Sequence, residues 1–155
     1  MTVLDHAPGE VQDRAVPCRP GPQPGRPQGR DRYTISEVAE YTGLSAHTLR
    51  WYERIGLMPH VDRTHTGQRR YTERDLDWLD LVGRLRLTGM PVADMVRYAQ
   101  MVREGEHTVA ARERLLSAHR DDVRRRIAEL RSTLDVLDYK IDIYADARRR
   151  ASEGV

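Results

Sequence analysis

The segment SAHTLRWYERIGLMP, from Ser45 to Pro59, combines one continuous helical pattern with several long donor side chains. Arginine can donate two parallel hydrogen bonds to a guanine edge or hold a phosphate. Short side chains and free N–H groups at the start of a helix favour close approach to DNA and to its phosphates. The residues of this segment that we expect to contact DNA are Ser45, His47, Thr48, Arg50, Tyr52 and Arg54.

A second cationic group, in the sequence GQRRYT, adds Arg69, Arg70 and Tyr71 to the candidate DNA contacts. Between positions 45 and 74, six arginines stand against three acidic residues, although the formal net charge of the 155-residue chain is only +2. A local concentration of positive charge is typical of a surface that meets a polyanion. A solvated surface is the alternative, and for Tyr52 the alternative is a core ring with its hydroxyl outward.

The elements that must position these side chains begin with two short helices. The sequence TISE, from Thr34 to Glu37, is a capping box and predicts a helix start. Gly43 is suited to end that helix, because glycine accepts a positive φ without strain. Ser45 is suited to cap the next helix, which Gly56 ends. Two short helices joined through TGLS predict a helix-turn-helix.

A β-hairpin, or wing, is predicted after the second helix, because LMPHVDRTHTGQRRYT has no helical period. One strand is expected to start at Leu57 or Val61 and the return strand to run from Arg69 to Tyr71, with HTG at the tip. Pro59 suits the start or edge of a strand. We expect the wing arginines to contact backbone phosphates, which fix position without reading sequence.

Two further helices are predicted beyond the wing. Thr72 and Asp75 form a second capping box, and Gly89 and Pro91 separate the third helix from the fourth. Trp78 is expected to pack at a helix edge. The apolar face of the third helix is expected to comprise Leu76, Leu79, Val82 and Leu85, and that of the fourth Val92, Met95, Val96, Ala99 and Val102.

One long helix is predicted over residues 107–150, where apolar residues follow a heptad pattern for about four repeats. Its seam consists of Leu116, Val123, Ile127, Leu130, Leu134, Leu137, Ile141 and Tyr144. A partner helix, most simply from a second copy of the chain, would bury this seam. The sequence therefore predicts a coiled-coil homodimer, and the alternative is a helix that folds back on its own domain.

The whole chain is thus expected to be mainly α, with three parts. Residues 1–31 hold six of the eight prolines and four of the eleven glycines, and we expect a disordered tail whose removal leaves stability unchanged. Residues 32–104 form the winged helix-turn-helix domain. Residues 107–150 form the dimerisation helix.

Several classes of function are disfavoured by composition. The single cysteine, Cys18, excludes an internal disulfide and a multi-cysteine metal site. His107 and His119 are too far apart on one helix to share a metal ion. No nucleophile–base pair, phosphate-binding glycine loop or metal cluster is present, so we expect neither an enzyme nor a cofactor. Without a signal peptide or an apolar run of roughly 18 residues, we expect a cytoplasmic, nucleoid-associated protein that does not contact a membrane.

The order of these elements resembles the MerR family of bacterial transcription regulators. The resemblance rests on YTISEVAEYTGLSAHTLRWYERIGLMP and GQRRYTERDLDWLDLVGRLRLTGMPVADM, with TLRWYE at Thr48–Glu53 in place of the family's TLRYYE-like run. It covers residues 33–103 closely. It implies that the terminal helices of two chains form an antiparallel coiled coil.

The resemblance also implies a mechanism. Such a homodimer would bind inverted repeats in double-stranded promoter DNA and distort an overlong spacer for RNA polymerase holoenzyme, at a cost of a few kcal/mol. Only about five residues follow Arg150, so we expect a small member without a large ligand-binding domain. A small organic effector at residues 80–115, or none, remains open. The alternatives are a repressor or architectural factor, and a coiled-coil adaptor that binds no DNA.

Overall fold

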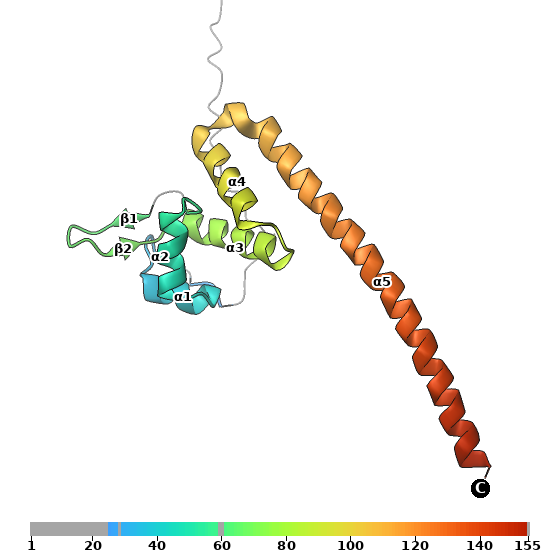
Figure 1. The fold of residues 1–155 in the computed structure, drawn as a ribbon. Coiled ribbons are helices and arrows are strands. Elements are labelled where there is room, and N and C mark those ends of the chain that lie inside the picture. The colour runs from blue at the N-terminus through green and yellow to red at the C-terminus, as the bar shows by residue number, and fades with distance from the viewer. Residues whose placement is uncertain (1–24, 28, 59–60, 155) are drawn as a thin grey trace, which may run out of the picture. The chain divides into compact units, whose positions relative to one another are not determined.

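The computed structural model describes residues 25–27, 29–58 and 61–154 and is mainly helical, with one small β-hairpin (Figure 1). This architecture confirms the predicted fold class. The chain divides into two compact units, with Arg103 the last residue of the first and Glu104 the first residue of the second. The N-terminal unit holds the helix-turn-helix and the wing, and the C-terminal unit holds the long helix.

The helix-turn-helix consists of α1, Ile35–Thr42, and α2, Ala46–Arg54. The predicted capping box is present, since the Thr34 hydroxyl accepts from the Glu37 N–H and the Glu37 carboxylate accepts from the Thr34 N–H. Gly43 ends α1 with a φ of 70°. The Ser45 hydroxyl then accepts a hydrogen bond from the Thr48 N–H at 3.0 Å. Local capping chemistry therefore sets both helix starts, as the sequence predicts.

The wing is an antiparallel pair of short strands, β1 at Asp62–Arg63 and β2 at Arg69–Arg70, with Arg63 opposite Arg69. The first strand starts later than expected. Leu57 does not begin it, because the Leu57 N–H donates to the Tyr52 carbonyl at 2.9 Å and thereby continues the end of α2. Pro59 lies outside the described residues.

The base of the wing is widened by a third segment of chain. Tyr33 and Tyr71 form an isolated bridge in which each backbone N–H donates to the other residue's carbonyl at 2.8 Å. The segment before α1 thus fixes the place where the wing joins the rest of the N-terminal unit.

The core of the N-terminal unit is completed by α3, Glu73–Leu87, and α4, Val92–Glu104. Thr72 and Asp75 form the second capping box as predicted. Trp78 stacks on Tyr98 with ring centroids 5.6 Å apart, and its indole N–H donates to the Leu57 carbonyl at 2.7 Å. Trp78 is therefore a packing residue. The predicted core residues that are buried are Leu76, Leu79, Val82, Leu85, Met95 and Ala99, whereas Val92 is exposed.

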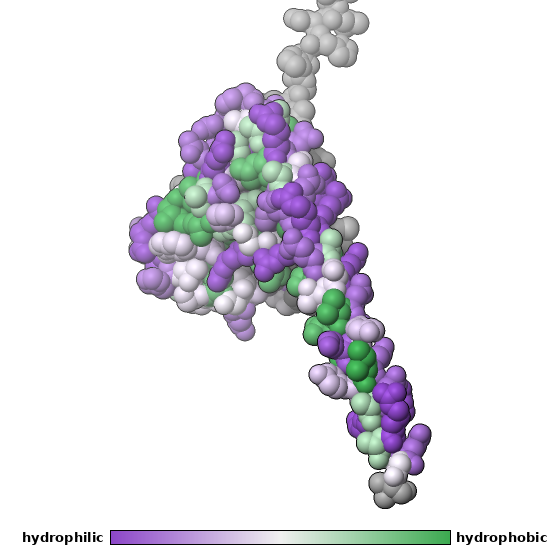
Figure 2. All heavy atoms as spheres, turned by 45° about the vertical axis from the view of Figure 1, so that its right-hand side comes forward, coloured by the Kyte–Doolittle hydropathy of each residue, from purple (hydrophilic) through white to green (hydrophobic). Residues whose placement is uncertain are grey.

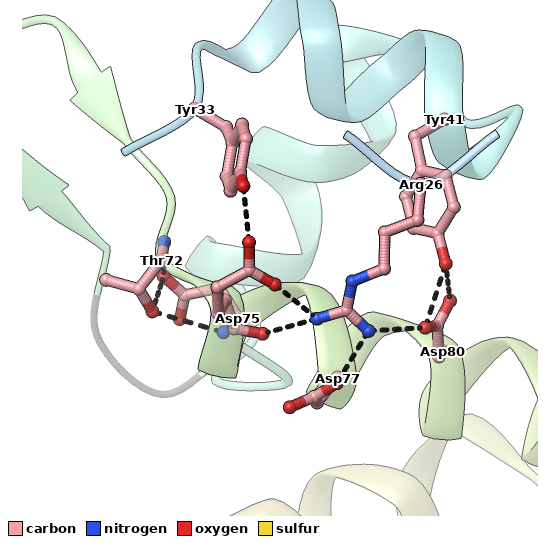
Figure 3. Close-up of polar contacts among 8 residues, drawn as sticks. Arg26, Tyr33, Tyr41, Thr72, Asp75, Asp77 and Asp80 are labelled. Carbon is pink, nitrogen blue, oxygen red and sulfur yellow. Dashed lines mark hydrogen bonds and ion pairs between the residues drawn. The ribbon is translucent and has the colours of Figure 1, made fainter. Parts of the chain in front are cut away.

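A short stretch before α1 contacts α3 through Arg26 (Figure 3). Its guanidinium pairs with Glu73 and Asp77 at 2.7 Å each and with Asp80 at 3.5 Å. The side chain is only 11% exposed. Residues 1–24 and 28 of the predicted tail lie outside the described residues, so the structure describes only positions 25–27 and 29–31 of it.

The C-terminal unit consists of a short 3-10 helix, η1 at Glu106–Thr108, and the 45-residue helix α5, Val109–Glu153. No residue of α5 is buried. Apolar side chains lie along its surface between charged ones (Figure 2). Among the described residues, no helix is both long and apolar enough to cross a membrane.

Candidate nucleic-acid interface

The exposed face of α2 carries three of the nine predicted DNA contacts. His47, Arg50, Trp51 and Arg54 are exposed, and their spacing places them on one side of the helix. Leu49, on the opposite side, is fully buried. No hydrogen bond or ion pair with a described residue engages the guanidinium of Arg50 or Arg54. These two donors are therefore available to a ligand on this face.

The first turn of α2 is held by its cap. The hydroxyls of Ser45 and Thr48 lie 2.9 Å apart, and the Ser45 oxygen also accepts from the backbone of Thr48. Ser45 is exposed and Thr48 is half-buried. Both hydroxyls thus have a structural role at the helix start, beside free N–H groups that favour an anion.

The wing is joined to α2 by a carboxylate that the sequence analysis did not single out. Glu53 accepts from the Arg69 Nε at 2.6 Å and from an Arg63 guanidinium N–H at 3.1 Å. Burial raises the pKa of the Glu53 carboxyl, but the hydrogen bond from Arg69 and the charges of Arg69 and Arg63 outweigh it and lower the pKa below its ordinary value. Glu53 is thus ionised at neutral pH and fixes the wing against the helix.

The two arginines predicted in the wing have different surroundings. Arg69 is committed to Glu53, so its first role is to orient the wing. Arg70 is half-buried, and its guanidinium donates only to neutral acceptors, the Arg69 carbonyl and the Gln68 side chain, both at 3.3 Å. Among the described residues no carboxylate forms a hydrogen bond or ion pair with Arg70, so it is the better candidate for a phosphate contact.

Two predicted contact residues have their rings in the core. Tyr52 is 4% exposed, and its hydroxyl accepts from Arg86 at 3.4 Å. Tyr71 is 0% exposed, and its buried hydroxyl has no hydrogen-bond partner among the described residues. Burial raises the pKa of the Tyr71 phenol to about 12, so it stays protonated. The structure therefore brings neither ring to the exposed face with Arg50.

Arg86, near the end of α3, is a cation beside α2 that the sequence analysis missed. It lies next to Tyr52, whereas Glu53 and the wing arginines lie along another side of α2. The contact between Arg86 and Tyr52 joins residues 34 positions apart, and no local sequence pattern predicts it. In the part of the chain that the structure describes, no three His, Cys, Asp or Glu side chains are grouped as metal ligands would be.

Comparison with known families places this geometry among transcription regulators. The model described as "MerR HTH family regulatory protein" matches residues 33–102, and the one described as "MerR, DNA binding" matches residues 76–139. A Haemophilus influenzae protein described as an uncharacterized HTH-type transcriptional regulator is 41% identical over 120 residues, which cover 77% of this chain and 89% of that protein.

Two crystal structures extend the comparison to the fold. HiNmlR, described as "a MerR family regulator lacking the sensor domain, bound to promoter DNA", is 41% identical with a TM-score of 0.70, over 76% of this chain and 93% of that one. A Listeria monocytogenes protein described as a MerR family transcriptional regulator is 39% identical with a TM-score of 0.73, over 78% of this chain and 92% of that one.

Proposed function

Because the chain belongs to the MerR family of helix-turn-helix transcription regulators, we propose that it acts as a homodimer on inverted repeats in double-stranded promoter DNA. It is a DNA-binding regulator and not an enzyme, as the sequence predicts. The observation that carries the finer proposal is the exposed face of α2, where Arg50 and Arg54 have no partner among the described residues.

The DNA contacts divide into two kinds. In the proposed complex, α2 lies in the major groove, where His47, Arg50 and Arg54 reach base edges or the phosphates beside them. Arg70 on the wing contacts the sugar-phosphate backbone and sets the position of the helix without reading sequence. Ser45 and Thr48 present the start of α2 to a phosphate, and Tyr52 and Tyr71 support this surface from the core.

The proposed dimer is formed by α5. Leu130, Leu134 and Ile141 of the seam are between 56% and 61% exposed in the single chain. Burying such side chains is favourable by about 1.5–3 kcal/mol each, so an antiparallel pairing of two α5 helices is the arrangement that this surface supports best. Because a two-fold dimer presents its two recognition helices symmetrically, it matches an inverted repeat.

The proposed consequence is control of transcription by distortion of the spacer DNA, as the family resemblance implies. The relative HiNmlR is described as bound to promoter DNA, and the same kind of target is proposed for this chain. RNA polymerase holoenzyme is the expected partner at that promoter, on the cytoplasmic nucleoid. A repressor or architectural factor would share the DNA contacts but would not raise transcription from a promoter with an overlong spacer.

The proposal is tested by fluorescence anisotropy with duplexes tiled over the DNA upstream of the gene, in a salt series. We expect tight binding to one inverted repeat, weakened by salt. Arg50→Ala should lower that affinity by about 10–100-fold, since a good base contact contributes about 1–3 kcal/mol. Arg97→Ala removes the same charge from an exposed site on α4 and should change little.

Two outcomes would contradict the proposal. Equal, weak binding to every duplex would indicate an architectural role. No binding at low salt, or the same loss in Arg97→Ala as in Arg50→Ala, would favour the coiled-coil adaptor.

A further inference from the structure

A recess of about 330 Å³ lies within the N-terminal unit, where the end of α1, the turn before α2 and the second half of α3 meet. The buried side chains of Tyr52 and Leu79 and the half-buried Leu44 form its apolar base. Small-molecule sites in proteins begin at roughly this size, about 300 Å³. The recess is open to solvent on one side, and a regulator of this size could receive a chemical signal there.

Gly83 keeps the recess open. It lies inside α3, where glycine is less favourable than alanine by about 0.5–1 kcal/mol. It does not have a positive φ, and a Cβ added at this position would meet no atom within 4 Å. Neither backbone conformation nor close packing therefore requires glycine here. Its effect on the structure is the space that a longer side chain would fill.

The one carboxylate in the wall of the recess is held by other residues of the N-terminal unit. Asp80 accepts from the Tyr41 hydroxyl with both oxygens, at 2.9 Å each, and lies 3.5 Å from the Arg26 guanidinium (Figure 3). Burial and the hydrogen bond to Asp80 raise the pKa of Tyr41 to about 12, so it remains a donor. The two oxygens of Asp80 are thus directed to Tyr41 and Arg26, although Asp80 lies one turn before Arg84 on the same helix.

Two arginines flank the recess with no carboxylate partner. At about 100° per residue along α3, Arg84 and Arg86 lie on either side of the face that carries Gly83. Among the described residues the Arg84 guanidinium has no hydrogen bond or ion pair, and that of Arg86 has only the 3.4 Å contact with the Tyr52 hydroxyl. Leu87, 86% exposed, extends the apolar surface at the edge.

We propose that this recess binds a small organic anion with an apolar body, such as an aromatic or branched aliphatic carboxylate or sulfonate. The anionic group lies between Arg84 and Arg86, because a guanidinium pairs well with planar or tetrahedral oxyanions. The apolar body covers Leu44, Leu79 and the Tyr52 ring. This site lies at the start of the 80–115 region in which the sequence left an effector open, and extends to α1 and α2.

The site is connected to the recognition helix through Tyr52. This residue belongs to α2, its ring lies 5.6 Å from that of the exposed Trp51, and its hydroxyl accepts from Arg86. A ligand that binds the Arg86 guanidinium would replace its contact with Tyr52, and would thereby change the packing of α2 on the side opposite its exposed face. The binding site itself stands without DNA, whereas this coupling to DNA affinity rests on the proposed function.

The test uses the full chain without DNA and two probes, anilinonaphthalene sulfonate and the uncharged phenylnaphthylamine. We expect the sulfonate to bind at least tenfold more tightly than the uncharged probe. Gly83→Leu should weaken sulfonate binding at least tenfold while the melting temperature stays equal or rises, because leucine favours the helix. The double variant Arg84→Gln, Arg86→Gln should weaken the binding of the sulfonate but not that of the uncharged probe. Arg97→Gln should weaken the binding of neither probe.

Equal binding of the two probes, or unchanged sulfonate binding by Gly83→Leu, would overturn the site. The site would also be overturned if the Arg84 and Arg86 variant lost DNA affinity but kept its sulfonate affinity. Those two cations would then contact DNA phosphates only. With DNA added, saturating sulfonate should shift the DNA affinity of the wild type at least fivefold and leave Gly83→Leu unaffected. An unchanged DNA affinity would overturn the coupling.

Discussion

The two units of this chain treat apolar side chains in opposite ways. In the N-terminal unit Val38, Leu49 and Leu76 have no exposed surface, whereas Leu134 and Ile141 of α5 are more than half exposed. The first unit therefore has a core of its own. The second has an amphipathic surface that is uncovered in the single chain, so the two units should respond differently to the same kind of substitution.

Their charged residues differ in the same way. In the N-terminal unit Arg69 reaches Glu53 across 16 positions, and both side chains are mostly buried. Along α5 the ion pairs join neighbours on the surface of one helix, such as Arg124 with Asp121. Exposed pairs of that kind contribute at most about 0.5 kcal/mol, so they do not replace a core. The stability of α5 must come from packing.

Breaking the proposed dimer should change the assembly most, because it separates the two chains. Leu134→Asp places a carboxylate in the middle of the seam in both chains, and burying an unpaired polar group costs several kcal/mol. We expect the dissociation constant to rise by more than about 100-fold, which corresponds to about 3 kcal/mol. Light scattering measures the change. Ser132→Asp, two residues away and outside the seam, should remain dimeric, and an unchanged dimer in Leu134→Asp would remove the proposed interface.

A matched pair of leucines sharpens the comparison between the units. Leu49→Ala creates a cavity in a closed core and should lower the free energy of unfolding by about 2–5 kcal/mol at any protein concentration. Leu137→Ala should act through association, so its cost should depend on concentration. Both tryptophans, Trp51 and Trp78, lie in the N-terminal unit, so urea titrations followed by fluorescence report on that unit and circular dichroism adds α5.

If both variants lost the same stability at every concentration, α5 would behave as part of a single-chain core. That result would support the alternative in which the helix folds back on its own domain.

The features predicted from sequence are those with a local cause. Capping boxes and glycine stops act within a few residues, so the starts of α1, α2 and α3 follow from the spacing of Thr34, Ser45 and Thr72. The apolar face of α3 follows from its helical period. The exposed donors of α2 follow for the same reason, since Arg50 and Arg54 are one turn apart.

The features that could not be predicted from the sequence depend on contacts between residues that are far apart in the chain. The contact of Glu53 with Arg63 and Arg69 has no local signature. Neither does the burial of Tyr71, because RRY alternates sides on a strand too short to show which side faces inward. The heptad pattern of α5 also does not include three exposed apolar residues that lie outside the seam, Val136, Tyr139 and Ile143. An antiparallel pair of helices would leave that second apolar face uncovered.

Arg26 tests whether the N-terminal unit begins before residue 32. Arg26→Gln removes the counter-charge from three carboxylates of α3, and hydrogen bonds to charged groups contribute about 1.5–3 kcal/mol. We therefore expect a loss of about 1–3 kcal/mol of unfolding free energy, in place of the unchanged stability expected from the composition of the tail. Arg30→Gln, which removes one exposed pair with Glu37, should cost less than about 0.5 kcal/mol.

Equal stability of Arg26→Gln and wild type in urea titrations would show that the contact with α3 contributes nothing in solution. The N-terminal unit would then not depend on Arg26 for its stability.

The smallest expected effect concerns the wing and depends on pH. The pKa of Glu53 is lower in the folded chain than in the unfolded chain, where it has its ordinary value near 4.3. The stabilisation is therefore fully present above the unfolded pKa and is lost as the pH falls through the folded pKa. Glu53→Gln should be less stable than wild type by about 1 kcal/mol at pH 7, and this difference should shrink toward zero below about pH 3.

The pH dependence separates the ion pair from packing. Glu40→Gln, at an exposed position of α1 with no ion pair among the described residues, controls for the loss of one negative charge. A deficit in Glu53→Gln that stayed constant from pH 7 to pH 3 would mean that the side chain acts through its shape and not its charge. In that case the wing would be positioned by the Tyr33–Tyr71 bridge alone, and its arginines would have more freedom to follow a DNA backbone.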